Sequence, residues 1–114
     1  GRVRVLRSLE PLKPEYKIPQ IGWNFIERSD ALSTTGDSWQ GTLLEGLDDK
    51  PYMYFVHSYV VEPEDQGCSL AYTYYGRDKF CSVIKKDNIT GCQFHPERSG
   101  EMGIQILRNF LKEN

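Results

Sequence analysis

Cys92-Gln93-Phe94-His95-Pro96-Glu97-Arg98-Ser99-Gly100 is the stretch around which the rest of the sequence is organised. It contains one of the two histidines of the chain, followed two residues later by a carboxylate, with a proline between them. A short β-rich run comes before it and an amphipathic helical pattern comes after it. In open α/β sheets, ligands gather just outside the carboxyl ends of strands. The residues around His95 therefore decide both the fold and the chemistry.

Side chains alternate faces along a strand, so Cys92 and Phe94 should point one way and Gln93 and His95 the other. Pro96 fixes its φ and cannot donate to a ladder, so the strand should stop there and the chain should turn. Such a turn lets Glu97 fold back toward the imidazole, orient it and leave its other nitrogen as a proton acceptor. The pattern predicts a base and its orienting group, without a nucleophile. A turn with a nearby surface carboxylate is the simpler alternative.

Composition limits the classes of protein to consider. A chain of 114 residues is at most one domain, and a net charge of −2 without a basic stripe argues against nucleic acid as a partner. Apolar runs are too short to span a membrane. Three isolated cysteines and no signal-type segment favour a reduced, cytoplasmic setting, although the start at Gly1 suggests a fragment. We expect no metal site, because only Glu97 lies at ligand spacing from a histidine, and we expect no cofactor.

Hydrophobic patterning predicts an α/β fold that is rich in strands, with antiparallel hairpins and one carboxyl-terminal helix. The expected strands cover 2–6, 17–26, 52–61, 68–75, 79–85 and 88–94, and the expected helix covers 99–112. The short links after 75 and 85 predict hairpins.

Several finer expectations follow from single residues. Gly22 should allow a neighbouring backbone to approach closely, and a hairpin is expected around 39–44 within an otherwise irregular excursion. His57 on the strand 52–61 fits a hydrogen-bonded core histidine better than a catalytic one. Ser99 is expected to cap the helix. The helical stripe is expected to be core; it consists of Ile104, Leu107, Phe110 and Leu111, with Ile106 beside them.

Three blocks of sequence, in this order and spacing, carry a family resemblance. They are Ile18-Pro19-Gln20-Ile21-Gly22-Trp23-Asn24, Tyr54-Phe55-Val56-His57-Ser58-Tyr59 and Gly91 to Gly100. Together they resemble the carboxyl-terminal half of triad-type class I glutamine amidotransferases, and within that family the glutaminase subunits that serve imidazole glycerol phosphate synthases in histidine biosynthesis. The resemblance covers nearly the whole chain, least securely between 27 and 50. We therefore expect residues 1–114 to be the carboxyl-terminal part of one amidotransferase domain.

The resemblance implies a mechanism and a set of site residues. A cysteine would attack the side-chain amide of L-glutamine, His95 would act as general base and acid, and Glu97 would orient it. Ammonia would pass to a separate (βα)₈ synthase subunit. Other roles carry over by position: Ser58 and Tyr59 would contact glutamine, and the partner interface and ammonia exit would involve Trp23, Asn24, Tyr54 and Arg98.

The chain also departs from the family pattern. Arg98 replaces the usual lysine, which keeps the charge on a larger, planar group. The nucleophile is expected outside the chain, because Cys92 should face away from His95, and Cys68 and Cys81 lie in β runs. Two alternatives stay open: a paralogue that supplies ammonia for nucleotide-sugar amination in surface-polysaccharide synthesis, and a non-catalytic interaction domain that retains the scaffold.

Overall fold

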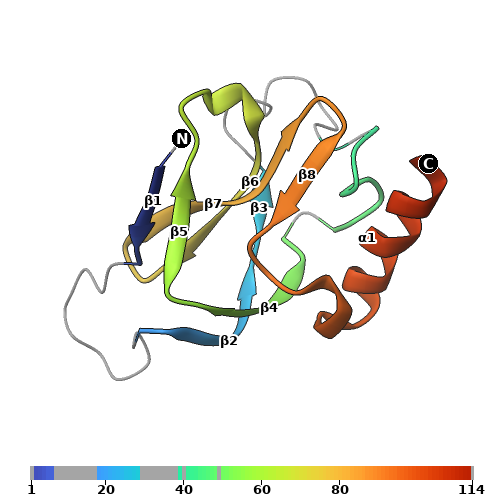
Figure 1. Ribbon diagram of the computed structural model, residues 1–114. Coiled ribbons are helices and arrows are strands. Elements are labelled where there is room, and N and C mark those ends of the chain that lie inside the picture. Colours follow the sequence, from blue (N-terminus) through green and yellow to red (C-terminus); the bar gives the residue numbers. More distant parts are fainter. Residues whose placement is uncertain (1, 7–17, 29–38, 40, 49, 114) are drawn as a thin grey trace.

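The computed structural model of the chain describes residues 2–6, 18–28, 39, 41–48 and 50–113. Within this part, two antiparallel sheets lie beside one α-helix (Figure 1), which confirms the expected strand-rich α/β class. The larger sheet has the order β1-β5-β7-β6-β3 with β8 paired to β7, and the smaller one pairs β2 with β4. The strands are β1 Arg2–Val5, β2 Gln20–Phe25, β3 Glu27–Arg28, β4 Tyr52–His57, β5 Tyr59–Glu62, β6 Ser69–Tyr75, β7 Asp78–Lys86 and β8 Ile89–Cys92. The helix is α1 Gly100–Glu113, and two short 3-10 helices are η3 Gln66–Cys68 and η4 Pro96–Arg98.

The two predicted hairpins are confirmed. β6 and β7 pair antiparallel around a turn in which Gly76 has a φ of +61°, and β7 and β8 pair around Asp87 with a φ of +55°. Positive φ at these positions suits the tight turns that match the twist of a hairpin. β7 also pairs with β5, where Cys81 lies opposite Val61. β7 therefore pairs with three strands of the larger sheet, β5, β6 and β8.

The predicted single strand over 52–61 is wrong in one respect. β4 ends at His57 and β5 begins at Tyr59, and the two strands belong to different sheets. Up to His57 the buried face is the expected one, but after Ser58 it inverts, so that Val60 is fully buried and Tyr59 is 59% exposed. One residue that leaves the ladder shifts every later side chain to the opposite face. The run of aromatic and β-branched residues carries no sign of this switch.

β2 and β4 form a ladder with an apolar outer face. The paired residues on that face are Ile21 with Val56, Trp23 with Tyr54, and Phe25 with Tyr52. Five of these six side chains are more than a third exposed, and Tyr54 is half-buried. We call this face the aromatic ladder. The opposite face of the same strands points into the core, where Met53 and Phe55 are fully buried.

Gly22 in β2 has a different role from the one expected. A Cβ built on Gly22 would meet no atom of the described residues within 4 Å, so no described backbone occupies the place of a side chain there. Its φ of +137° is instead a conformation that L-residues rarely adopt. The glycine is required by the local backbone, and the predicted close approach is wrong.

Trp39 and three later leucines, Leu43, Leu44 and Leu47, contribute to the core, and the described residues 39 and 41–48 form no hairpin. Trp39 is buried and its indole N–H donates to the carbonyl of Leu70 at 2.8 Å, while turns follow from Gly41 to Gly46. Asn109 of α1 donates to the carbonyls of Leu43 and Glu45, both at 2.8 Å. The expected hairpin around 39–44 is wrong for the described residues, because they form successive turns: the N–H of Thr42 donates to the carbonyl of Trp39 at 3.0 Å, and the N–H of Glu45 donates to that of Thr42 at 3.1 Å.

α1 confirms the predicted helix but presents a different face to the core. Ile106 is 2% exposed and Asn109 is 7% exposed, so this face packs inward. The residues expected in the core are largely exposed: Ile104 46%, Leu107 43%, Phe110 51% and Leu111 73%. The expectation that this stripe is core is wrong for the described chain. The spacing of apolar residues identified an amphipathic helix, but it did not show which face of the helix packs against the rest of the chain.

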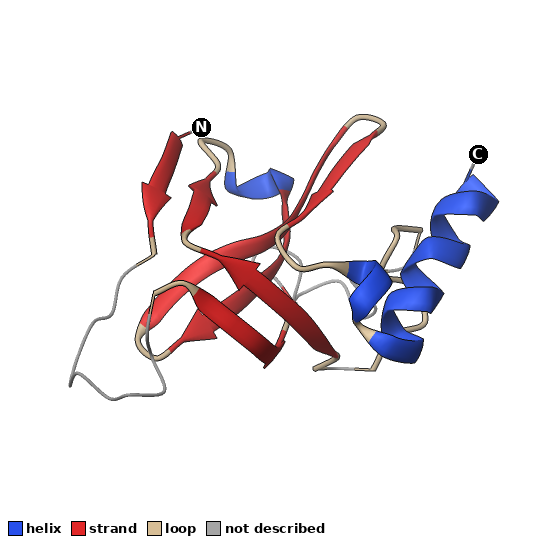
Figure 2. Cartoon of the chain, turned by 60° about the horizontal axis from the view of Figure 1, so that its bottom comes forward, coloured by secondary structure: helices blue, strands red, loops and turns tan. Residues whose placement is uncertain are grey.

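Gly103 brings the start of α1 against η4 (Figure 2). A Cβ at Gly103 would lie 1.9 Å from the carbonyl oxygen of Pro96 and 2.9 Å from the Cβ of Ser99. No side chain fits there without movement of the backbone. The turn that follows His95 is therefore packed directly on the helix.

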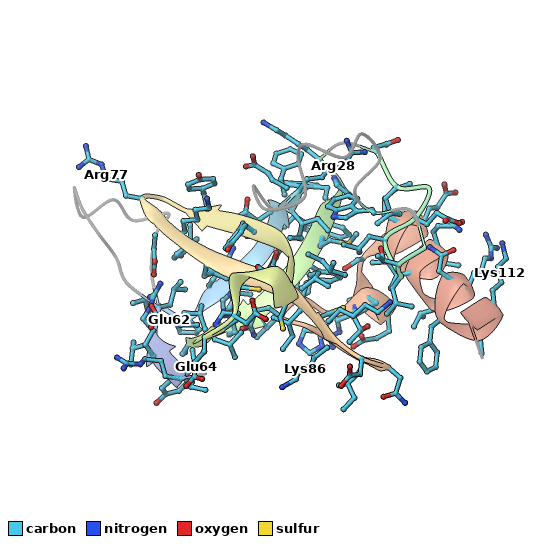
Figure 3. All side chains as sticks on the ribbon, turned by 90° about the horizontal axis from the view of Figure 1, so that it is seen from above. Arg28, Glu62, Glu64, Arg77, Lys86 and Lys112 are labelled. Atoms are coloured by element: carbon cyan, nitrogen blue, oxygen red, sulfur yellow. The ribbon has the colours of Figure 1, made fainter. Side chains whose placement is uncertain are left out.

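Charged side chains of both signs are spread around the molecule (Figure 3), with Arg77 at the β6–β7 turn, Lys112 on α1, and Glu62 beside β1. Arg4 fastens β1 to the larger sheet. Its guanidinium donates to both carboxylate oxygens of the buried Asp78 at 2.7 and 2.8 Å and to Glu62 at 2.6 Å. A bidentate pair of this kind fixes geometry as well as charge.

Candidate active site

His95 lies where the chain leaves one sheet and joins the other. Beyond the end of β8, the backbone N–H of Gln93 still donates to the carbonyl of Ser82 on β7 at 2.9 Å. Two residues later, the N–H of His95 donates to the carbonyl of Tyr54 on β4 at 3.0 Å. Phe94 between them is buried in the core, so the expected alternation holds and His95 faces outward.

His95 and Glu97 contact each other across the proline. His95 has extended backbone angles, and Pro96 then opens η4, as the proline predicts. The Nδ1 atom of His95 lies 3.1 Å from the Oε2 atom of Glu97, with the side chains 45% and 61% exposed. The backbone amide of Glu97 first, and then the ring of His95, lower the pKa of the Glu97 carboxyl group.

An ionised carboxylate at this position accepts the proton of Nδ1 and leaves Nε2 of a neutral ring as the acceptor. No hydrogen bond from the described residues reaches Nε2. The pair has the geometry of a general base and its orienting group.

Three of the four residues assigned by resemblance to a partner interface come together beside this pair. The rings of Trp23 and Tyr54 lie edge to face with centroids 5.9 Å apart, and the guanidinium carbon of Arg98 lies 5.8 Å from the centroid of the Tyr54 ring. Trp23 also contacts Tyr52 at 5.6 Å. Tyr54 thus joins the aromatic ladder to the turn that carries His95.

Asn24 does not join this group. It lies opposite the buried Met53, on the face of β2 that points away from the aromatic ladder. Its amide donates to the carbonyl of Tyr74 at 2.8 Å, and its oxygen accepts from the N–H of Phe25 at 2.7 Å. In this structure Asn24 ties β2 to β6.

Ser58 and Tyr59 lie at the switch from β4 to β5. The carbonyl of Ser58 accepts from the N–H of Leu6 at 2.8 Å, and the ring of Tyr59 is exposed. Among the described residues, no hydrogen bond joins either of them to His95 or Glu97. Their backbone is fixed, and the Tyr59 side chain is accessible.

His57 is a hydrogen-bonded core histidine, as expected. Its Nδ1 lies 3.0 Å from the carbonyl oxygen of Tyr59, and its Nε2 lies 2.6 Å from the side-chain oxygen Oε1 of Gln20. Burial lowers the pKa of the imidazole below its ordinary value of 6.5, and the bond to Tyr59 opposes this in part. Both partner atoms are oxygens that accept, so a neutral ring, which carries one N–H, donates to one of the two.

The surroundings of two cysteines, Cys81 and Cys92, raise the pKa of the thiol. Cys81 is buried, accepts from the hydroxyl of Ser69 at 3.0 Å and donates to the carbonyl of Val83 at 3.3 Å, and burial raises its pKa. Burial raises the pKa of Cys92 to about 11, and this residue packs against the core. A reactive thiol needs a lowered pKa.

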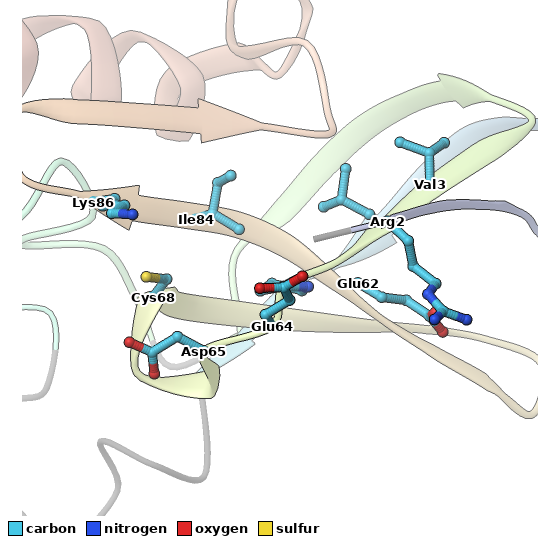
Figure 4. A pocket seen from close by; sticks show the side chains of 10 residues that line it. Arg2, Val3, Glu62, Glu64, Asp65, Cys68, Ile84 and Lys86 are labelled. Carbon is cyan, nitrogen blue, oxygen red and sulfur yellow. The ribbon is translucent and has the colours of Figure 1, made fainter.

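Cys68 lies in η3, at the other end of the larger sheet from η4 (Figure 1). It lines a hollow of about 420 Å³ between β1, β5 and β7, together with Arg2, Glu62 and Lys86 (Figure 4). His95 and Glu97 do not line this hollow. The charged side chains that line this hollow are of both signs.

The described residues contain no cluster of three His, Cys, Asp or Glu side chains placed to hold a metal ion. Their single α-helix is too short and too polar to cross a membrane.

The family model of glutamine amidotransferase class-I matches residues 15–114. This range covers the aromatic ladder, the β4–β5 switch and the His95–Glu97 turn. The chain therefore belongs to the class-I glutamine amidotransferase family.

Within that family, the chain is similar to proteins named imidazole glycerol phosphate synthase subunit HisH. It is 42% identical over 104 residues to the HisH subunit of Lactococcus lactis, a match that covers 90% of this chain and 46% of the relative. It is 42% identical over 98 residues to HisH 1 of Legionella pneumophila, with 85% and 44% covered. It is 43% identical over 96 residues to HisH of Methanocaldococcus jannaschii, with 84% and 43% covered. The chain spans about half the length of the curated relatives it matches.

Proposed function

We propose that this chain supplies the base half of the active site of a glutaminase that delivers ammonia to a synthase partner. The acceptor reaction is that of an imidazole glycerol phosphate synthase, in histidine biosynthesis. The observation that carries the proposal is the contact of His95 with Glu97 at 3.1 Å, at a strand end of a class-I amidotransferase chain. The similarity to HisH subunits supports the choice of acceptor.

In the proposed reaction, a thiolate attacks the side-chain amide carbon of L-glutamine. His95 takes the thiol proton on Nε2 and gives it to the leaving nitrogen, so that ammonia departs and a glutamyl thioester remains. Water, activated by the same nitrogen, then hydrolyses the thioester to glutamate and restores the thiol. Glu97 keeps the ring in the required tautomer throughout. Ser58 and Tyr59, at the β4–β5 switch, hold the bound glutamine.

The thiol in this scheme comes from outside the 114 residues. Cys81 and Cys92 have raised pKa values, and Cys68 lies at the far end of the sheet from η4. The relatives are about twice as long as the part that this chain matches. We therefore place residues 1–114 in the carboxyl-terminal part of one amidotransferase domain.

The synthase partner, a (βα)₈ subunit, docks on the aromatic ladder in this proposal. Exposed apolar patches with large aromatic side chains are typical of protein interfaces. Trp23 is 45% exposed and borders Arg98 through Tyr54. Ammonia leaves the site along this border, and Asn24 supports it from the opposite face of β2.

The test uses the complete subunit, including the nucleophile region, with and without a purified imidazole glycerol phosphate synthase partner. We expect glutamine hydrolysis that increases when the partner is added, and product formation that depends on glutamine. A subunit that hydrolyses no glutamine with any partner would favour a non-catalytic interaction domain. Stimulation only by a nucleotide-sugar synthase would reject the imidazole assignment and leave the glutaminase activity in place.

A further inference from the structure

Ser99 makes two hydrogen bonds that join the His95 turn to β4. Its hydroxyl donates to the carbonyl of His95 at 2.7 Å and accepts from the backbone N–H of Tyr54 at 3.0 Å. Ser99 is only 2% exposed. The hydroxyl is therefore fixed between the catalytic turn and the strand that carries the aromatic ladder.

This arrangement differs from the helix cap that the sequence predicted. Ser99 does precede α1, and its carbonyl accepts from the N–H of Gly103 at 3.3 Å. Its hydroxyl, however, bonds to residues 45 and 4 positions earlier in the chain. A capping hydroxyl would bond to an amide of the first helical turn. The side chain therefore contributes to tertiary structure at the site, not to the end of the helix.

Tyr54 makes both of its backbone bonds to this turn. Its carbonyl accepts from the N–H of His95 at 3.0 Å, and its N–H donates to Ser99. These two bonds are the ones that an edge residue of a strand would make to a neighbouring strand. The Ser99 hydroxyl takes the place of a backbone carbonyl that the turn cannot supply. Without it, the N–H of Tyr54 loses its hydrogen-bond partner.

We propose that Ser99 is a positioning residue for the general base His95, an inference that rests on the proposed glutaminase function. By holding the His95 carbonyl to β4, Ser99 fixes where the imidazole projects from the sheet. Displacement of a catalytic group by about 1 Å can lower a rate about a hundredfold. The Ser99 hydroxyl bonds to the backbone of His95 and Tyr54, so its proposed effect is exerted through His95.

The chain offers a matched control in Ser82. Both serines are buried, at 2% and 1% exposure, but the Ser82 hydroxyl has no hydrogen-bond partner among the residues that the structure describes. Ser82→Ala thus removes a buried hydroxyl of the same kind without breaking a bond. It lies on β7, where its backbone carbonyl, which the substitution retains, holds Gln93.

The experiment compares Ser99→Ala with Ser82→Ala in the complete subunit with its partner. For Ser99→Ala we expect kcat for glutamine to fall by about tenfold to a hundredfold, with KM changed by less than about twofold. Ser82→Ala should keep both constants. Equal kcat for Ser99→Ala and wild type would overturn the inference, as would a loss confined to KM.

Backbone hydrogen exchange gives a second readout that does not depend on activity. In Ser99→Ala the amides of Tyr54 and His95 should exchange at least about tenfold faster than in wild type, while Ser82→Ala leaves them unchanged. Wild-type exchange at both amides in Ser99→Ala would contradict the positioning role. If the wild-type subunit hydrolyses no glutamine, the proposed function fails and the exchange result still decides on Ser99.

A third variant covers the case in which Ser99→Ala does not fold. Ser99→Thr keeps the hydroxyl, so we expect kcat within about threefold of wild type and the slow exchange of Tyr54 retained. A folded Ser99→Thr protein with a kcat loss of tenfold or more would show that the hydroxyl is not what positions His95.

Discussion

The two histidines of this chain are both tied to β4, but their surroundings are opposite. His95 bonds to Tyr54 of that strand through its backbone N–H. His57 ends the strand itself, is 9% exposed and has a partner on each ring nitrogen. The ring of His95 is bonded only through Nδ1 among the described residues, and its side chain is 45% exposed. Both rings are oriented by hydrogen bonds, but only His95 keeps a nitrogen accessible. The difference shows that accessibility of the second nitrogen, more than the presence of an orienting bond, separates a candidate base from a structural histidine.

The strongest test of this difference is His95→Ala in the complete subunit. We expect glutamine hydrolysis to fall by about 10²- to 10⁴-fold, because the proton acceptor is lost. Use of free ammonia by the partner should continue, and the unfolding free energy should change by less than about 0.5 kcal/mol. Parallel assays with glutamine and with ammonium salts measure both reactions. Loss of the two activities together would assign His95 a structural role.

The reciprocal change, His57→Ala, should act mainly on stability. It leaves the Tyr59 carbonyl and the Gln20 amide without their partner and opens a cavity, so we expect a loss of about 2–4 kcal/mol. Urea unfolding of the variant beside His95→Ala measures the contrast. A change below about 1 kcal/mol would mean that His57 is not part of the core as described.

The same contrast between buried and accessible groups applies to the thiols. A pKa of about 11 for Cys92, against an ordinary value of 9.0, lowers its thiolate fraction at pH 8 about a hundredfold. Alkylation of Cys92 by iodoacetamide, followed by peptide mass spectrometry, should be slower by at least that factor in the native protein than in urea. Comparable rates in the two conditions would identify Cys92 as accessible.

The smallest expected effect is a pH dependence of stability. Because the pKa of His57 is lowered on folding, the unfolded chain binds this proton more readily than the folded one. Its contribution to stability is therefore complete above pH 6.5 and is lost as the pH falls from 6.5 toward the folded pKa. Urea unfolding at pH 7.5 and 5.5 measures it, and His57→Gln should remove this component. An identical pH dependence in that variant would place the titrating group elsewhere.

The sequence predicted the contact of His95 with Glu97 better than it predicted which surfaces are buried. The meeting of His95 with Glu97 follows from local geometry, because a strand end, a proline and a two-residue spacing leave few alternatives. The switch at Ser58, the bonding of Ser99 to Tyr54 and the exposed stripe of α1 do not follow from local geometry. Each depends on a neighbour far away in the sequence, and periodicity alone cannot say which neighbour covers which face.

Gly22 shows a related limit. A glycine in a strand pattern signals either a close approach or an unusual φ, and both have the same appearance in a sequence. The φ of Gly22 is +137°, and no described atom lies within 4 Å of a Cβ built there, so the unusual φ is the reason for this glycine.

Gly103 offers a stricter criterion for identifying the same turn in other sequences. A His-Pro-Glu tripeptide is short enough to occur by chance in unrelated proteins. Gly103 lies eight residues after the histidine. A Cβ built on it would lie 1.9 Å from the carbonyl oxygen of Pro96, so this position excludes every other residue type. A search for His-Pro-Glu that also requires glycine at that spacing selects for a helix docked on the turn, and so for an imidazole held in place.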